Sequence, residues 1–268
     1  MTNSTRIWMI VAIAALSAAY WYITKPEPSK TPPQPIVVKT GQALLRDEWD
    51  KVIGAACKPP LGNSKAEWSI VEVGDFQCPQ CGKVHGTVEK LIGDSGGHAK
   101  LYFINWPLNM HANARAAALA ALAAEKQGKF WPMYGQIYDA QSGLEGAKAD
   151  RADAILTDDA KRVGLDLKAF DADRASDALK MRLNQQMGLA VALDTQSTPT
   201  FYVRKNGSPT IYWFIGLKGQ EPTPMTPRYP GLETLIANAP WHGRTLPPPT
   251  DQSAPPTPPM PPAPGQGH

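Results

Sequence analysis

The chain has 268 residues, of which 43% are hydrophobic and 19% are charged, and its formal net charge is +3. These values fit a globular protein, and so small a net charge without a long basic run argues against a nucleic-acid-binding protein. Three cysteines are too few for a disulfide-stapled mini-domain or for a four-cysteine zinc site. The 27 prolines are about twice average usage, and fifteen of them lie in residues 26–35 and 247–264. We therefore expect the folded body between these two stretches.

The first segment of the chain is an uncharged apolar run over residues 7–23. As a helix it would be about 26 Å long, which is at the short end of a membrane span. An uncleaved anchor would keep Tyr20, Trp21 and Tyr22 as an interfacial aromatic belt, whereas a signal peptide would be cleaved near the small residues 17–19. We expect residues 1–24 to be a membrane anchor or, alternatively, a signal peptide, and both interpretations export the body.

Proline-rich segments flank the folded body on both sides. Residues 25–36 predict an extended, polyproline-type linker, and residues 247–268 predict a solvated, disordered tail. The tail has two further interpretations, a docking segment for a proline-binding partner or a wall-spanning spacer. The body itself is expected over residues 37–246.

The first half of the body alternates strands and helices. A buried strand is predicted over residues 68–74 from their β-branched composition, and it runs into the pair Cys78 and Cys81. Apolar residues at helical spacing predict a helix over residues 82–91, and a second strand fits residues 101–105.

A block of helices follows before the strand pattern resumes, and we interpret it as an insertion at about residues 108–195. The alternation of strands and helices predicts an α/β layer architecture. Within the block, helices are expected over residues 112–127, 129–140, 152–163, 167–176 and 178–193. After it we expect strands over residues 200–204 and 210–215, a hairpin turn over 205–208 and a last helix over 232–237.

The cysteine pair carries the most specific chemistry in the sequence. Cys78 falls where a strand becomes a helix, and unpaired N–H groups together with the positive end of the helix dipole favour a thiolate there. Pro79 suits the first helical turn, where no N–H is needed. Cys78 is therefore expected to be the exposed nucleophile with a low pKa, and Cys81, one turn later, the more buried resolving thiol. Half of a metal site and a purely structural disulfide are the alternatives.

Thr198 and Pro199 precede a predicted strand. Such a proline is often only a strand-entry residue, but a cis peptide bond here would bring the Thr198 backbone beside the cysteine pair. The residues alone leave both interpretations open.

These motifs together resemble the DsbA-like thiol–disulfide oxidoreductases of the thioredoxin superfamily. The resemblance runs from about residue 60 to residue 216, and several motifs occur in the family's order. They are PLGN (60–63), IVEVGDFQCPQC (70–81), WPLNMH (106–111), QGKFW (127–131) and STPTFYV (197–203).

The resemblance implies an α/β, thioredoxin-like fold with an inserted all-helical domain, here preceded by one N-terminal transmembrane helix. It also implies that Cys78 attacks, that Cys81 resolves through a Cys78–Cys81 disulfide, and that Thr198 with a cis Pro199 holds substrate backbone. Glu72 matches the family's buried acid, which could relay a proton to or from Cys81. A strand-end carboxylate in a polar pocket is the alternative interpretation of Glu72.

Two features depart from the strongest oxidases of the family. Pro79 is common in the family, but Gln80 stands where those oxidases carry histidine, so we expect a weaker oxidant than DsbA itself. The threonine before Pro199 also occurs in isomerases and reductases, which leaves the direction of exchange open. His85 is expected mainly to pack, with tuning of the pair as the alternative.

Two further residues, His111 and Cys57, lie outside the motif of the cysteine pair. His111 is interpreted as a structural loop-to-helix residue. For Cys57, an intermolecular bond, a regulatory bond to the pair and an inert thiol are all possible.

The sequence thus predicts a periplasmic thiol–disulfide oxidoreductase, anchored to the inner membrane by residues 7–23 or released by signal cleavage. Its expected partners are cysteine-containing envelope proteins and a membrane or periplasmic redox partner, without nucleic acid, metal or organic cofactor. The alternative is an envelope binding or assembly module whose cysteine pair is structural or binds a metal such as copper.

Overall fold

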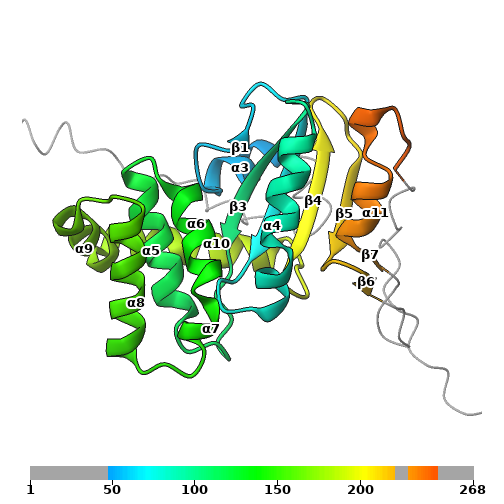
Figure 1. The fold of residues 1–268 in the computed structure, drawn as a ribbon. Helices are drawn as coiled ribbons and strands as arrows, with labels where there is room; N and C mark the ends of the chain where they lie inside the picture. The colour runs from blue at the N-terminus through cyan, green and yellow to red at the C-terminus, as the bar shows by residue number, and fades with distance from the viewer. Residues whose placement is uncertain (1–47, 221–228, 247–268) are drawn as a thin grey trace, which may run out of the picture. The chain divides into compact units, whose positions relative to one another are not determined.

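A five-stranded mixed sheet organises the part of the chain that the structure, a computed structural model, describes (Figure 1). The described residues are 48–220 and 229–246, so the predicted anchor at 7–23, the linker at 25–36 and the tail at 247–268 lie outside them. The strand order is β1-β3-β2-β4-β5. These strands are β1 (Leu61–Gly62), β2 (Trp68–Gly74), β3 (Ala99–Asn105), β4 (Thr200–Lys205) and β5 (Ile211–Ile215).

Strand directions bring distant parts of the chain to one edge of the sheet. β2 is parallel to β3, while β4 runs antiparallel to β2 with Val73 opposite Thr200. The carboxyl end of β2 therefore lies beside the start of β4. Cys78 follows the first of these strands and Pro199 precedes the second, so the topology itself brings them together.

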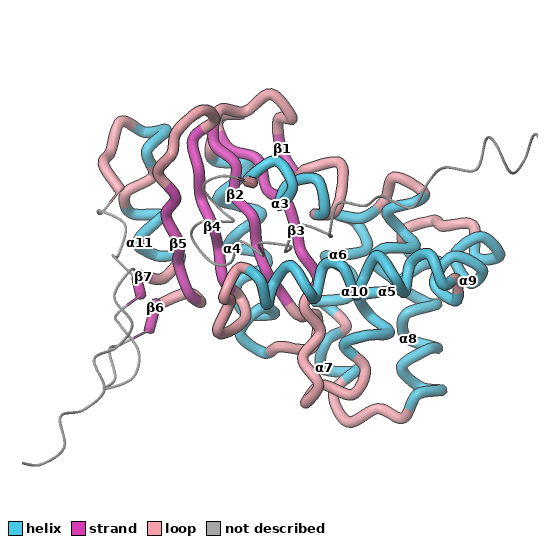
Figure 2. The backbone as a smooth tube through the Cα atoms, turned by 180° about the vertical axis from the view of Figure 1, so that it is seen from behind, coloured by secondary structure: helices cyan, strands magenta, loops and turns pink. Residues whose placement is uncertain are grey.

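The two faces of the sheet carry different helices (Figure 2). Ile70 and Leu101 pack against α4 (Pro79–Asp94) and α11 (Leu232–Ala237), while Val71 and Ile104 pack against α3 (Trp49–Ala55) and α10 (Asp177–Ala192). Successive strand residues point to opposite faces of the sheet. Because helices cover both faces, the central strands carry apolar residues on each of them. Glu72 lies two residues after Ile70, so its side chain points to the same face of the sheet, the one that α4 covers.

The helical insertion occupies the chain between β3 and β4 (Figure 1). Its core combines the alanine-rich apolar face of α5 with an aromatic cluster on α6. In this cluster Tyr134 packs against Phe76, which lies in the turn after β2. α9 and α10 begin at capping residues, since Asp166 accepts from the Ala169 N–H at 2.9 Å and Ser176 from the Leu179 N–H at 3.3 Å. The helices before α10 are α5 (Ala114–Lys126), α6 (Phe130–Asp139), α7 (Gln141–Leu144), α8 (Ala149–Arg162) and α9 (Leu167–Ala175).

Most predicted elements occur within a few residues of their expected bounds. The predicted strand over 68–74 is β2, and the helix predicted over 82–91 is longer, since it begins at Pro79 immediately after the cap Cys78. Elements with too few residues to show a period were missed. These are α3, α7, β1, a 3-10 helix (Pro240–His242) and the two-residue strands β6 (Gly219–Gln220) and β7 (Tyr229–Pro230), which pair with each other.

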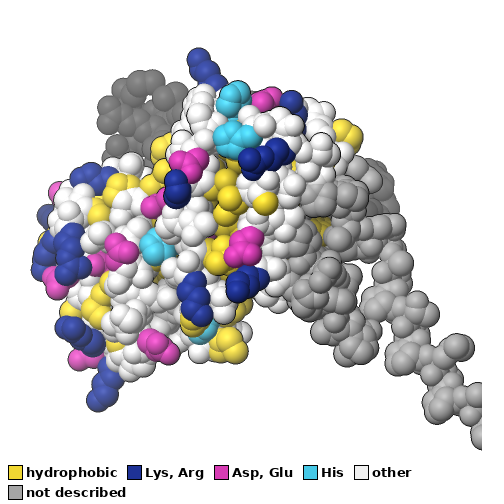
Figure 3. Space-filling view, turned by 45° about the vertical axis from the view of Figure 1, so that its right-hand side comes forward, with side chains coloured by type: hydrophobic (Ala, Val, Ile, Leu, Met, Phe, Trp, Pro, Cys, Tyr) yellow, Lys and Arg dark blue, Asp and Glu magenta, His cyan; other side chains and the backbone are white. Residues whose placement is uncertain are grey.

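Charged side chains of both signs are interspersed on the face that Figure 3 shows. This mixing agrees with the small net charge of the sequence. Within residues 48–220 and 229–246, no helix has the length and apolar composition needed to cross a membrane.

Candidate active site

The two cysteines of the C-x-x-C sequence lie where the chain turns from β2 into α4. Cys78 is the N-cap of α4 with extended backbone angles (φ −70°, ψ 119°), and Pro79 fills the first helical position. Cys81 follows one turn later, and both side chains are free thiols in this structure. The structure therefore describes the reduced form of the pair.

Cys78 is surrounded by groups that favour its thiolate. A side-chain hydrogen bond from Cys81 is the largest cause lowering the pKa of Cys78 to about 5, against the opposing effect of burial. The Thr198 side chain and the backbone N–H groups of Cys81 and Gln80 lower this pKa further. Cys78 thus lies at the N-cap of α4, where free N–H groups and the positive end of the helix dipole favour a thiolate, although the structure shows no side-chain capping hydrogen bond to the neutral thiol.

Cys81 has the opposite environment. Its side chain is fully buried, and burial raises the pKa of Cys81 well above its ordinary value. The charges of Cys78 and Glu72 raise it further, whereas the Asp75 backbone lowers it. The two thiols of one pair therefore ionise in widely separated pH ranges.

The prediction that Cys78 is exposed was wrong in degree. Cys78 is 7% exposed and Cys81 is 0% exposed, so the order of accessibility is as expected but both residues are buried. The reason is the helical insertion, whose core cluster includes both cysteines. A substrate would reach Cys78 only through this small opening.

Glu72 is a fully buried carboxyl on the α4 face of β2. Burial is the main cause raising the pKa of Glu72 to about 8, and the hydroxyl of Tyr134, which donates to Oε2 at 3.1 Å, lowers it. Oε1 has no hydrogen-bond partner among the described residues. Since the charge of Glu72 affects the pKa of Cys81, the two groups are coupled, and Glu72 can exchange a proton near neutral pH.

Thr198 reaches the pair from a segment 120 residues away. The Cys78 thiol donates a hydrogen bond to the Thr198 carbonyl oxygen at 3.4 Å, and the Thr198–Pro199 peptide bond is cis. The Thr198 hydroxyl has no hydrogen-bond partner within the described part of the chain, yet this side chain lowers the pKa of Cys78 because it can donate to the thiolate. Thr198 is 8% exposed and lies at the edge of the site.

The two residues between the cysteines, Pro79 and Gln80, are exposed. Gln80 lowers the pKa of Cys78 through its backbone N–H, and its side chain is not among the causes of that shift. A side chain at this position of the helix points outward, while the backbone N–H points along the helix axis towards the cap.

His85 packs rather than approaching the sulfur atoms. Its Nδ1 lies 2.7 Å from the Gly82 carbonyl, its ring stacks on Tyr138, and its Nε2 is 3.6 Å from Asp139. These contacts join α4 to α6 and agree with the prediction that His85 mainly packs.

Asp75 and His111 form a pair beside the site that the sequence interpretation missed. The fully buried Asp75 side chain accepts from the backbone N–H groups of Gln77 at 2.8 Å and Leu108 at 2.9 Å, and its Oδ2 lies 2.6 Å from His111 Nδ1. Asp75 and His111 both belong to the motifs quoted above. Their partnership could not be inferred from spacing because 36 residues separate them.

Cys57 is buried in a polar cluster away from solvent. Asn105 Nδ2 lies 3.4 Å and Gln186 Nε2 lies 3.7 Å from its sulfur, and burial raises the pKa of Cys57 well above its ordinary value, with Glu125 adding to the rise. A fully buried thiol of raised pKa reacts poorly. Of the three interpretations, the inert thiol fits this environment.

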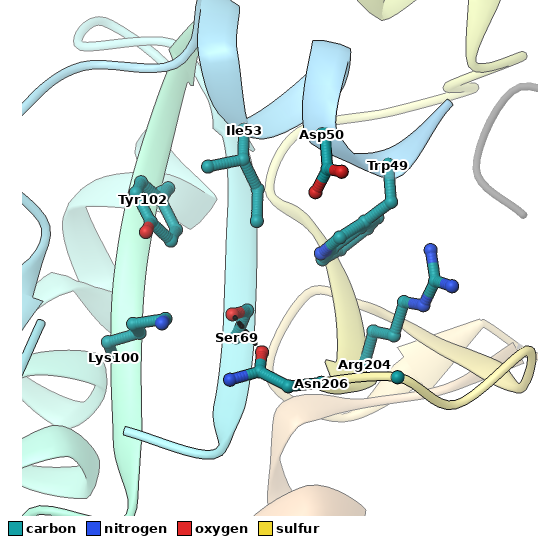
Figure 4. Close-up of a pocket in the computed structure, with 9 residues that line it drawn as sticks. Trp49, Asp50, Ile53, Ser69, Lys100, Tyr102, Arg204 and Asn206 are labelled. Carbon is teal, nitrogen blue, oxygen red and sulfur yellow. Dashed lines mark hydrogen bonds between the residues drawn. The ribbon is translucent and has the colours of Figure 1, made fainter. Parts of the chain in front are cut away.

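One pocket of the described residues lies away from the cysteine pair. A pocket of about 450 Å³ lies at the opposite edge of the sheet, where Ser69, Lys100 and Asn206 face a common space below Trp49 (Figure 4). None of its lining residues belongs to the cysteine pair. Among the described residues, no group of three or more His, Cys, Asp or Glu side chains is placed to hold a metal ion.

Comparison with known proteins agrees with this geometry. A family model described as Thioredoxin matches residues 57–208, which is more than half of the chain and includes the cysteine pair and Pro199. The chain belongs to the thioredoxin family. Two solved structures have a similar fold. They are the thiol-disulfide exchange protein alpha-DsbA2 of Wolbachia pipientis (TM-score 0.53, 21% identity, covering 65% of this chain and 87% of that one) and DsbA2 of Pseudomonas aeruginosa (TM-score 0.50, 20% identity, 59% and 87%). The predicted thioredoxin-like α/β fold with a helical insertion is thereby confirmed.

Curated relatives of this thioredoxin-family chain carry two kinds of name. It is 30% identical over 207 residues to "Na(+)/H(+) antiporter NhaA 1" of Mycolicibacterium gilvum, a match covering 75% of this chain and 30% of the antiporter. It is 28% identical over 171 residues to "Probable disulfide bond formation protein D" of Bacillus anthracis, covering 60% of this chain and 76% of that protein. The chain thus spans about 30% of the length of this antiporter.

The pKa of Cys78 gives the first testable prediction. In the reduced protein, the ultraviolet absorbance of the thiolate should rise with a midpoint near pH 5, as the pKa of about 5 requires. Replacing Cys81 by alanine should move this midpoint upward, because the Cys81 thiol is the largest cause of the low pKa. A midpoint near the ordinary value in the wild-type protein would contradict the described environment.

Proposed function

We propose that the chain is a thiol–disulfide oxidoreductase whose reacting groups are Cys78 and Cys81. The observation that carries the proposal is the asymmetry of the pair. Cys78 has a small opening to solvent and a pKa lowered to about 5, whereas Cys81 is fully buried with a raised pKa. An attacking thiolate and a protected resolving thiol need these two environments.

The reaction runs through a mixed disulfide. The Cys78 thiolate attacks one sulfur of a substrate disulfide, and the second substrate sulfur leaves as a thiolate. Cys81 then loses its proton and attacks the Cys78 sulfur, which closes the Cys78–Cys81 disulfide and releases the first substrate sulfur. The pair loses two electrons and the substrate gains them, and the reverse sequence oxidises a substrate dithiol.

Glu72 supplies the proton transfer that this sequence requires. Cys81 cannot attack as a neutral thiol, and its burial excludes bulk water as the base. Glu72 is coupled to Cys81 and has a pKa of about 8, so its carboxylate can accept the Cys81 proton and return it in the reverse direction. The buried-acid role predicted for Glu72 thus has a physical basis.

Thr198 and Pro199 are proposed to hold substrate backbone beside Cys78. The Thr198 carbonyl already accepts from the Cys78 thiol at 3.4 Å, so this loop borders the sulfur that a substrate must approach. Cysteine-containing proteins of the cell envelope are the proposed substrates, with a membrane or periplasmic redox partner. The uncharged run at residues 7–23 supports an exported, inner-membrane-anchored location.

The reduction potential of the pair tests both the function and its direction. The pKa of about 5 lies between the values of about 3.5 for DsbA and about 7 for thioredoxin. We therefore expect a potential between about −120 mV and about −270 mV when the full chain is equilibrated with glutathione buffers. Binding of stoichiometric metal without exchange between the pair and glutathione would instead favour the metal-binding alternative.

A further inference from the structure

The turn between β2 and α4 is held by side chains of the helical insertion. Gln77 accepts from the Asn113 N–H and donates to the Leu144 carbonyl at 2.9 Å. These two hydrogen bonds hold the turn in place at Gln77. Gln141, on the four-residue helix α7, contacts the backbone on both sides of this residue. In Figure 1, α7 lies at the end of the sheet where α4 begins.

Gln141 uses both N–H groups of its amide on the turn. Its Nε2 donates to the Phe76 carbonyl at 2.7 Å and to the Cys78 carbonyl at 3.0 Å. The Cys78 carbonyl also accepts the first hydrogen bond of α4, from the Gly82 N–H at 3.1 Å. One amide therefore fixes the carbonyl before the cysteine cap and the carbonyl of the cap itself.

The space beside Gly82 is independent evidence for the position of the Gln141 side chain next to α4. A Cβ built on Gly82 would lie 2.2 Å from Gln141 Oε1 and 2.8 Å from its Cδ, closer than non-bonded atoms can approach. The residue after Cys81 can therefore carry no side chain while Gln141 keeps its position.

We propose that Gln141 is a positioning residue for the cysteine pair, and that Gly82 is without a side chain because the Gln141 amide occupies that space. This inference rests on the proposed function and adds a residue of the insertion to it.

The physical reason lies in the orientation of the peptide groups around the sulfur. Fixed carbonyls at Phe76 and Cys78 fix the direction of the Cys78 Cα–Cβ bond, and with it the place of the sulfur over the N–H groups of Gln80 and Cys81. Donation by the amide also offsets the negative ends of two carbonyl dipoles near a developing thiolate. Without Gln141, the turn can rotate and the thiolate loses part of its stabilisation.

The test measures the thiolate absorbance of Cys78 against pH in the reduced full chain. Gln141→Met keeps the length of the side chain but removes both donors, and we expect it to raise the Cys78 pKa by about one unit, a tenfold loss of thiolate at low pH. Gln127→Met is the matched control, because Gln127 also joins two elements of the insertion through Asp166, at 3.1 Å and 2.9 Å, but lies away from the pair. The control should leave the Cys78 pKa unchanged.

A double-mutant cycle tests the link between Gly82 and Gln141. Gly82→Ala should raise the Cys78 pKa in the wild-type background, because the new methyl group displaces the amide. In the Gln141→Ala background the same substitution should add nothing, since the space is empty. This non-additivity is the signature of a shared site, which a general loss of stability does not produce.

Two results would overturn the inference. One is an unchanged Cys78 pKa in a folded Gln141→Met protein, and the other is an equal effect of Gly82→Ala in both backgrounds. Neither depends on enzyme activity. A chain that shows the predicted pKa shifts but exchanges no disulfides would refute the proposed function and leave the positioning role of Gln141 standing.

Discussion

Replacing Cys78 with alanine is expected to lower the rate of insulin reduction by at least about 100-fold, to the level of the buffer thiols alone. Of the two cysteines in the pair, Cys78 alone has a lowered pKa and a side chain in contact with solvent. No other described thiol can therefore take its place. Cys57→Ala is the matched control. Its thiol is fully buried with a raised pKa, so its loss should leave the rate of exchange unchanged.

Cys81→Ser separates the two roles within the pair. This variant keeps the attacking thiolate but cannot resolve the mixed disulfide, so covalent complexes with substrate proteins should accumulate on non-reducing gels. The same complexes should be absent from Cys78→Ser. If Cys78→Ser trapped substrates and Cys81→Ser did not, the order of the two thiols would be reversed.

Glu72→Gln is expected to stabilise the reduced protein by about 3 kcal/mol at pH 7, although it removes the proposed proton relay. The buried carboxyl has a pKa of about 8 when folded and about 4.5 when unfolded. Each unit of difference corresponds to about 1.4 kcal/mol, and at pH 7 the unfolded carboxyl is ionised while the folded one is mostly protonated. Glutamine has nearly the same shape and still accepts from Tyr134.

The sign of this effect follows from the protons bound in each state. Between pH 4.5 and about 8 the folded state holds a proton on Glu72 that the unfolded state has lost. Unfolding therefore becomes easier as the pH rises through this window, and the contribution of Glu72 is most favourable below pH 4.5. In Glu72→Gln this dependence disappears.

Urea unfolding at several pH values, under reducing conditions, measures the prediction. The difference in unfolding free energy between Glu72→Gln and wild type should be small near pH 4.5 and grow up to about pH 8. Glu233→Gln, at an exposed carboxyl of α11, is the control and should show no such growth. A difference that is constant with pH would mean that Glu72 is ionised in the folded state. Exchange by Glu72→Gln should also slow at the step in which Cys81 attacks.

The sequence alone predicted the central strands, the long helices and the place of the cysteine pair. β2 is apolar on both faces, and the alanine-rich α5 has strong helix propensity, so short-range patterns sufficed for them. The position of Cys78 at a strand-to-helix junction also followed from local pattern, and with it the direction of its pKa shift. The membrane anchor and the two proline-rich segments stay predictions, because they lie outside the described residues.

Only the tertiary structure decided the environment of the pair. The burial of Cys78, the raised pKa of Cys57 and the pKa of Glu72 depend on what the helical insertion packs against them. Thr198 and Gln141 reach Cys78 from 120 and 63 residues away. A local pattern records the period of a strand or helix, whereas burial and long-range hydrogen bonds arise when distant segments meet. The sequence by itself thus identified the residues that we expect to react, and the packing of the insertion decided how strongly each one holds its proton.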